Sequence, residues 1–330
     1  MVDNHPITFS SLELHHGVSS KNFNHTYKKH LSEYRTWDKE DKKEAEEGVI
    51  FAKNISAYMG IDEVCLSNGE LYTILLNKSA RGRKGSIVAI IKGTKSEDII
   101  QAIRQIPKAL RDGVKEVTAD LSPSMNLIIQ KCFANADTTL DRFHIQQLAS
   151  EAVQKIRIIH RWEAIEQEAE AIKEARESGE KHKAELYPNG DTRKQLLARA
   201  RHLLFKPSSK WTASQKERAK ILFSEYPDIK KAYNLSTGLR AIFELKITPG
   251  VARTKLAQWY EKADKSGFKS FESLKDTFYE SSEKIVNYFK FRSSNAASES
   301  FNAKLKNFRK DLRGVSDLPY MIFRITKVFG

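Results

Sequence analysis

The sequence has little cysteine, no long apolar run and fewer acidic than basic residues. Two cysteines, Cys65 and Cys132, are too few for a disulfide framework or a cysteine-ligated zinc site, and they favour a reducing compartment. No apolar stretch approaches the roughly 20 residues that span a bilayer. The first residues also lack the basic and then apolar order of a signal peptide. We therefore expect a soluble cytoplasmic protein without a membrane partner.

The charge balance favours a polyanionic partner. Lys and Arg number 56 against 42 Asp and Glu, which gives a formal net charge of +14 over 330 residues. An excess of this sign makes nucleic acid the first candidate. The chain is also 40% hydrophobic and 10% aromatic, so it can bury a sizeable core, which excludes general disorder.

Composition divides the chain into four parts. Residues 1–57 are polar and contain a mixed-charge run typical of a solvated helix, which predicts a peripheral arm. Residues 58–144 hold short β-rich runs, and residues 145–288 are rich in Ala, Glu, Lys, Leu and Arg, which predicts several helices. Residues 289–330 are strongly basic and hold two further predicted helices.

The second part predicts a mixed sheet. Runs of β-branched and aromatic residues at 58–66, 71–77 and 86–93 predict an antiparallel meander. The predicted elements that follow are a helix at 96–110, a strand at 114–121, a helix at 122–134 and a strand at 137–143. This βββαβαβ order gives an α/β fold with helices on the sheet. It suits an RNase H-like layer, with the helical stretch as a large all-helical insertion before the final helices.

Two acids of this predicted sheet are candidates for a catalytic or ligand-binding role. Asp62 is inside an otherwise apolar strand, where an ionised carboxylate is costly unless it is hydrogen-bonded, paired or bound to a cation. Its neighbour Glu63 points to the opposite face, and the pattern alone does not choose between the two. Asp120 ends the fourth predicted strand, at the edge where α/β sheets place ligands. The alternative for each acid is a carboxylate that binds nearby backbone amides.

A third acid lies on a late predicted helix. Asn295, Glu299 and Asn302 share one helical face, whereas Phe301 and Leu305 lie on the other. The aromatic face is typical of core packing. Glu299 then faces either a cleft or water, and the spacing alone favours water.

Four short strings occur in order, namely GIDE (60–63), TADLSPSMN (118–126), DRFH (141–144) and SNAASESFNAKLKNFRKDLRG (294–314). Each string is weak by itself. Their order and spacing together resemble those of DDE-type insertion-sequence transposases of the ISL3 group. The resemblance extends from about residue 59 to the C-terminus, which is most of the chain.

The resemblance implies an RNase H-like catalytic domain, with the helical insertion placed before the final catalytic helix. In it Asp62, Asp120 and Glu299 are the catalytic acids and the ligands of two Mg²⁺ or Mn²⁺ ions. The implied reaction is metal-dependent DNA strand cleavage at transposon ends, followed by transfer of the 3′-hydroxyl into target DNA. Carboxylates are the hard oxygen ligands that such ions prefer. The rival functions are an RNase H-like structure-specific nuclease and a catalytically inactive DNA-binding remnant.

Four further residues are candidates for supporting the acids. Asp141 either caps the helix that begins near residue 142 or orients a metal ligand. His144 either contacts DNA phosphate or a catalytic carboxylate, or is an ordinary first-turn histidine. Asn295 and Asn302 flank Glu299 on its helical face.

Two basic clusters are predicted to contact DNA phosphates, with a solvated basic face as the alternative. They comprise the loop residues Arg81, Arg83 and Lys84, beside Lys78, and the helix residues Lys304, Lys306, Arg309, Lys310 and Arg313. The insertion also holds Trp162, Trp211 and Trp259, which either pack in its core or hold extruded bases.

The first 57 residues differ from the longer relatives, which carry an N-terminal zinc ribbon and a helix-turn-helix. This segment is too short and polar for both modules. We therefore expect a separate DNA-recognition polypeptide. The resemblance also implies a homodimer or larger assembly at paired ends, and association with the bacterial nucleoid when DNA is bound.

Overall fold

The structure is a computed structural model that describes residues 2–3, 7, 9–67, 69–311 and 317–330. The chain divides into two compact units. One comprises Met1–Asp141 with Ser293–Gly330, and the other comprises Arg142–Arg292. The first is mixed α/β and the second is helical.

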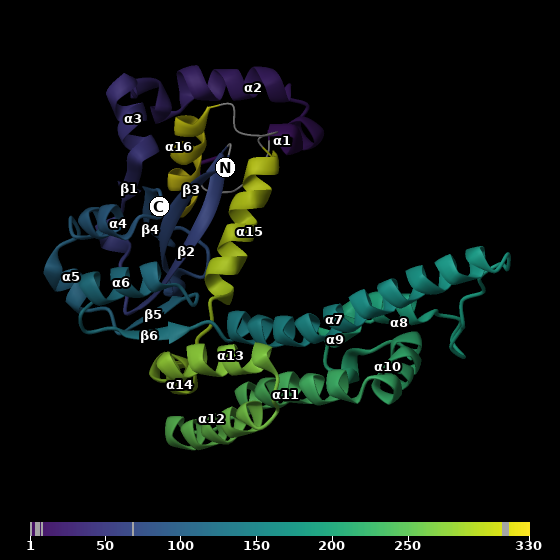
Figure 1. Ribbon diagram of the computed structural model, residues 1–330. Coiled ribbons are helices and arrows are strands. Elements are labelled where there is room, and N and C mark those ends of the chain that lie inside the picture. Colours follow the sequence, from purple (N-terminus) through teal and green to yellow (C-terminus); the bar gives the residue numbers. More distant parts are fainter. Residues whose placement is uncertain (1, 4–6, 8, 68, 312–316) are drawn as a thin grey trace. The chain divides into compact units, whose positions relative to one another are not determined.

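The first unit is built on a six-stranded mixed sheet of order β1-β4-β3-β2-β5-β6 (Figure 1). Its strands are β1 (Gly48–Ile50), β2 (Tyr58–Ser67), β3 (Glu70–Asn77), β4 (Ile87–Lys92), β5 (Glu116–Ala119) and β6 (Asp137–Leu140). Strands β1, β4, β3 and β2 pair antiparallel, whereas β5 and β6 are parallel additions beside β2. The predicted mixed sheet is therefore present. Strand β1 was not predicted and comes from the segment expected to be a peripheral arm.

Helices cover both faces of this sheet. They are α4 (Ser96–Ile103), α5 (Lys108–Asp112), α6 (Pro123–Cys132), α15 (Ala296–Asp311) and α16 (Leu318–Phe329). On β2, Met59 and Ile61 pack in a core with α4 and α6, whereas Val64 and Leu66 pack in a core with α15 and α16. Side chains alternate between the faces of a strand. Asp62 consequently lies on the face that α15 covers, and Glu63 lies on the other.

Local sequence sets where these helices start and stop. The predicted helix at 96–110 is divided into α4 and α5, because Pro107 lacks a backbone N–H and restricts the residue before it. Helix α6 begins at Pro123, and the hydroxyl of Ser122 accepts a bond from the backbone N–H of Met125. The last strand is shorter than predicted and ends at Leu140, since a helix begins at residue 142.

The N-terminal segment, predicted as a polar peripheral arm, packs on α16. Its elements are α1 (Phe9–His16), α2 (Ser20–Thr26), η1 (Tyr27–Leu31), η2 (Glu33–Thr36), α3 (Lys39–Glu47) and η3 (Ala52–Asn54). Phe9, Tyr27 and Tyr34 pack with Tyr320 and Phe323 of α16 in one buried cluster. The segment is therefore part of the core, because its aromatic residues are buried although its overall composition is polar.

A buried arginine anchors this contact. Arg324 of α16 is 0% exposed, and its guanidinium lies 5.2 Å from the ring centroids of both Phe9 and Tyr27. Its Nη2 donates to the carbonyl of Val2 over 3.3 Å. Cation–π attraction of this kind increases when the site excludes water.

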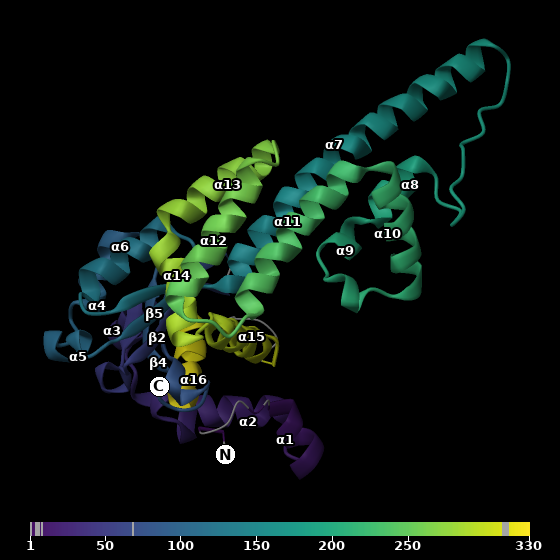
Figure 2. The ribbon, with the colours of Figure 1, turned by 90° about the horizontal axis from the view of Figure 1, so that it is seen from below.

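The second unit consists of helices. They are α7 (Arg142–Glu177), α8 (Arg193–Arg199), α9 (Arg201–Leu204), η5 (Ser208–Lys210), α10 (Ala213–Glu225), α11 (Pro227–Glu244), α12 (Pro249–Asp264), α13 (Lys269–Glu280) and α14 (Ser282–Phe291). Helices α7 and α11 run side by side (Figure 2). Thr192 and Thr212 form capping boxes that start α8 and α10. Among the described residues, no helix is long and apolar enough to cross a membrane.

The three tryptophans of this unit differ in environment. The indole N–H groups of Trp211 and Trp259 each donate over 2.8 Å to a backbone carbonyl, of Leu203 and Leu235 respectively. Trp259 is 3% exposed, whereas Trp162 is 60% exposed. Trp211 and Trp259 thus pack within the helical unit, as tryptophans with a satisfied N–H commonly do.

Candidate active site

Two carboxylates lie at neighbouring parallel strands, Asp62 within β2 and Asp120 directly after the end of β5. In the β2–β5 ladder Gly60 pairs with Thr118, so Asp62 and Asp120 each lie two residues beyond that pair. Both are half-buried. The pKa of Asp62 is raised to about 6, chiefly by burial; the negative charges of Asp120 and Glu299 contribute to the rise, and a bond from the Glu63 N–H opposes it. The site therefore concentrates negative charge.

The side-chain amide of Asn295 lies between these two carboxylates. Its Nδ2 is 3.4 Å from Asp62 Oδ2 and 3.4 Å from Asp120 Oδ1. Nδ2 of Asn302, two turns further along α15, donates to the same Oδ2 of Asp62 over 2.8 Å. The sequence predicted both asparagines as supporting candidates. The structure brings both to the acids.

Glu299 lies on α15 between these two asparagines and is exposed. Partial burial raises its pKa, and so do the charges of Asp141 and Asp120. Within the described part of the chain, no group of three or more His, Cys, Asp or Glu side chains is close enough to hold a metal ion as it stands. The charge of Glu299 thus interacts with those of the two aspartates, but its side chain does not join them in one metal-binding group.

Gly60 is where α15 approaches the sheet most closely. A Cβ added at Gly60 would lie 2.5 Å from Ser298 Oγ and 3.3 Å from Thr118 Oγ1. Ser298 is 0% exposed and belongs to the same helix as Glu299. A glycine inside a strand often marks such an approach. This role of Gly60 was not predicted, although a glycine two residues before Asp62 in a predicted strand was the available signal.

Asp141 and His144 are in different units. Asp141 is 1% exposed, and its Oδ1 accepts a bond of 3.3 Å from the backbone N–H of Asn295, at the start of α15. This contact suits a role in holding the asparagine beside the acids. His144 lies in the first turn of α7, in the helical unit. Its role, like the capping role of Asp141, stays a prediction.

The predicted loop cluster is largely exposed but has one buried member. Lys78, in η4 (Lys78–Ala80), is bound to Glu116 over 2.9 Å and to the hydroxyl of Ser293. Glu116 is 0% exposed. Burial lowers the pKa of Lys78, and the Glu116 carboxylate opposes that effect. Lys78 is therefore an internal ion-pair partner, whereas Arg81, Arg83 and Lys84 are exposed.

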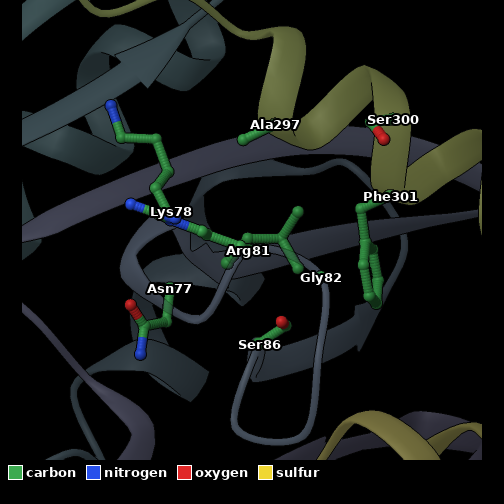
Figure 3. Close-up of a pocket in the computed structure, with 9 residues that line it drawn as sticks. Asn77, Lys78, Arg81, Gly82, Ser86, Ala297, Ser300 and Phe301 are labelled. Atoms are coloured by element: carbon green, nitrogen blue, oxygen red, sulfur yellow. The ribbon is translucent and has the colours of Figure 1, made fainter.

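The exposed loop residues lie beside the basic face of α15. Lys304 donates to the carbonyl of Gly82 over 3.0 Å, which joins the loop to the helix. A cavity of about 250 Å³ lies between them. Figure 3 shows two of its lining residues, Arg81 on the loop side and Ser300 on the helix side. Lys306 and Lys310 are exposed and Arg309 is half-buried. Arg313 lies outside the described residues.

The family model of ISL3-type DDE transposases, described as a transposase, matches residues 59–325. This chain belongs to that transposase family. The matched segment includes Asp62, Asp120 and Glu299 together with the helical unit. A search of the curated proteins finds none that matches this chain. Family membership supports a role in DNA transposition and recombination, with DNA as the partner.

Replacing Gly60 by Ala is expected to destabilise the transposase by about 1–3 kcal/mol, because the new methyl group overlaps Ser298 Oγ. Urea unfolding measures the change. The double variant Gly60→Ala with Ser298→Ala should recover most of the loss. Gly250→Ala is the matched control, since no atom lies within 4 Å of its added Cβ. Equal effects of the single and double variants would contradict the proposed close contact.

Asp62→Asn is expected to stabilise the metal-free transposase at neutral pH and not in acid. The folded state raises the pKa of Asp62 from 3.8 to about 6, so ionisation of this group destabilises the fold. This destabilisation by the ionised carboxylate is absent below pH 3.8 and complete above about pH 6. Urea unfolding with chelator should show a gain of ~2 kcal/mol at about pH 7.5 and none near pH 3.5. The exposed acid variant Asp98→Asn should show no such difference, and a pH-independent gain for Asp62→Asn would contradict the assignment.

Proposed function

We propose that this transposase cleaves DNA strands at transposon ends and joins the freed 3′-hydroxyl to target DNA at a site formed by Asp62, Asp120 and Glu299. The sheet order, with an antiparallel meander followed by parallel strands, suits the RNase H-like fold expected for such an enzyme. The observation that carries the proposal is the shared Asn295 amide. It brings two carboxylates from neighbouring parallel strands to one point beside the helix of Glu299.

The residues present suit a divalent cation. Among the described residues, no Lys, Arg or His is ion-paired with Asp62 or Asp120, and burial together with the neighbouring negative charges raises the pKa of Asp62. The buried Oδ1 atoms of Asn295 and Asn302 also lack hydrogen-bond partners in that part of the chain. Carboxylate and amide oxygens are the ligands preferred by Mg²⁺ and Mn²⁺. Asp62, Asp120 and Glu299 would hold the ions.

Bound divalent ions would stabilise the charge that develops on the phosphate and favour ionisation of the attacking water or hydroxyl. The residues of the chain position the reacting groups. Asn302 fixes one oxygen of Asp62, and Asn295 keeps Asp62 and Asp120 together. Gly60 and Ser298 hold α15 close to the sheet, so Glu299 stays near both aspartates. The same acids can serve water and the DNA hydroxyl, because both nucleophiles are oxygens.

The exposed cations of the loop and of α15 favour binding of the DNA backbone. Arg81, Arg83 and Lys84 belong to a loop that Lys304 joins to α15, the helix that carries Glu299. Such side chains contact phosphates with little sequence preference. Binding of DNA as a homodimer or larger assembly, and end recognition by a separate polypeptide, remain predictions.

Asp120→Asn is expected to reduce cleavage of labelled transposon-end DNA at least about a hundredfold while DNA affinity stays equal or increases. The change removes a ligand charge and also lessens repulsion of phosphate. Gel assays measure cleavage, and fluorescence anisotropy measures affinity. Glu63→Gln is the matched control, because that acid lies on the opposite face of β2 and should retain activity.

The products of the unaltered chain distinguish the rival functions. A supercoiled target with cleaved ends should yield joined strands in Mg²⁺ or Mn²⁺. Cleavage without joining would favour a structure-specific nuclease. Binding with neither product, in either metal, would favour an inactive DNA-binding remnant.

Mn²⁺ is expected to raise the melting temperature of the unaltered chain at neutral pH, because a ligand that binds only the folded state stabilises it. The double variant Asp62→Asn with Asp120→Asn should show a much smaller rise. Calorimetric titration checks the same difference directly. An equal shift in both proteins would place the metal elsewhere and contradict the proposed ligands.

A further inference from the structure

The helical unit contains a cavity of about 670 Å³. Its wall is formed by the first turns of α7, the segment that follows α9, and the C-terminal half of α11. This cavity uses none of the three proposed catalytic acids. Its lining combines charge, aromatic rings and unsatisfied polar atoms, which together indicate a ligand.

Two buried polar atoms in the lining lack partners among the described residues. Arg240 donates through Nη2 to the carbonyl of Phe205 over 3.1 Å, but its Nη1 is unsatisfied. Gln146 donates through Nε2 to the hydroxyl of Ser236 over 3.0 Å, but its Oε1 is unsatisfied. A buried polar atom without a hydrogen-bond partner destabilises the fold. Both atoms are closed to solvent as they stand, so a ligand with an acceptor and a donor would satisfy them once the two side chains turn into the cavity.

The charge of the lining favours an anion. Four cations contribute to the wall, namely Arg142, Lys206, Lys210 and Arg240, against the single carboxylate of Glu244. Lys206 and Lys210 are exposed, so they can reach a ligand at the mouth. Phosphate groups are the common partners of such clusters.

The lining also offers flat apolar surface. Phe143 is 48% exposed and Phe205 is half-buried. The guanidinium of Arg142 lies 4.7 Å from the ring centroid of Phe143 and 5.4 Å from that of Tyr288, which orients it at the start of α7. Planar nucleobases stack on exposed rings of this kind.

We propose that this cavity binds one unpaired nucleotide of a DNA strand. The cations hold its phosphate, Phe143 stacks on its base, and Arg240 Nη1 and Gln146 Oε1 bind the base edge. Inorganic phosphate would leave the rings unused, and an apolar ligand would leave the cations unpaired. A base within a duplex has its faces and pairing edge already occupied. The inference rests on the proposed action on DNA and adds a nucleotide site in the helical unit.

The test measures anisotropy of the full chain with a blunt duplex and with the same duplex carrying a three-nucleotide overhang. The overhang should increase affinity about tenfold, the range of stacking on an aromatic ring. Phe143→Ala should remove this gain and leave blunt-duplex affinity unchanged. Lys206→Ala, an exposed substitution, should reduce the gain. Tyr279→Ala is the control, because this ring is 71% exposed and does not line the cavity.

Photo-crosslinking locates the nucleotide. An iodouracil in the overhang should crosslink to peptides that contain Phe143 or Phe205. Equal affinity for both duplexes, an equal loss for both in Phe143→Ala, or crosslinks confined to other peptides would overturn the site. A free mononucleotide that competes as well as the overhang would also overturn it, in favour of a small-molecule site. Failure of the unaltered chain to bind any duplex would contradict the proposed action on DNA itself.

Discussion

The contact between α15 and β2 at Gly60 is the constraint on which the candidate site depends. Helix α15 carries Glu299 and Asn302 and begins directly after Asn295, so its distance from the sheet determines whether any of the three can reach the aspartates. The absence of a side chain at Gly60 permits that distance. The amides then hold together carboxylates that would otherwise repel each other. Burial and mutual repulsion thus oppose the arrangement, and hydrogen bonds and helix packing maintain it.

Much of the sheet could be predicted because its signals are local. β-Branched runs and turn residues marked β2, β3, β4 and β5, and the capping residue Ser122 marked the start of α6. Strand β1 could not be predicted, since a three-residue strand depends on its partner β4 rather than on its own sequence. The burial of the N-terminal aromatic residues depends likewise on α16, which is almost 300 residues away. Composition alone had suggested a peripheral arm.

The candidate site could likewise be predicted only where its signals are local in the sequence. Periodicity placed Asp62 and Glu63 on opposite faces without choosing between them, and the choice required knowledge of which face α15 covers. The helical spacing put Glu299 with two asparagines, but only the folded chain brings Asn295 between the aspartates. For Lys78, the folded structure differs from what the sequence suggested. Its position in a basic loop suggested DNA, whereas its side chain is paired internally with Glu116. Charge patterns indicate which residues attract polyanions only after burial is known.

The chain leaves the first unit at Asp141 and returns to it at Ser293. Until that return, the sheet face formed by Val64, Leu66 and Ile74 has no partner, because Phe301 and Leu305 of α15 supply the matching apolar surface. A ribosome must therefore finish nearly the whole polypeptide before this face is covered. Chains that terminate before α15 would expose this apolar sheet face and would lack Glu299. Completion of synthesis, folding of the sheet face and assembly of the candidate site are coupled by the order of the segments.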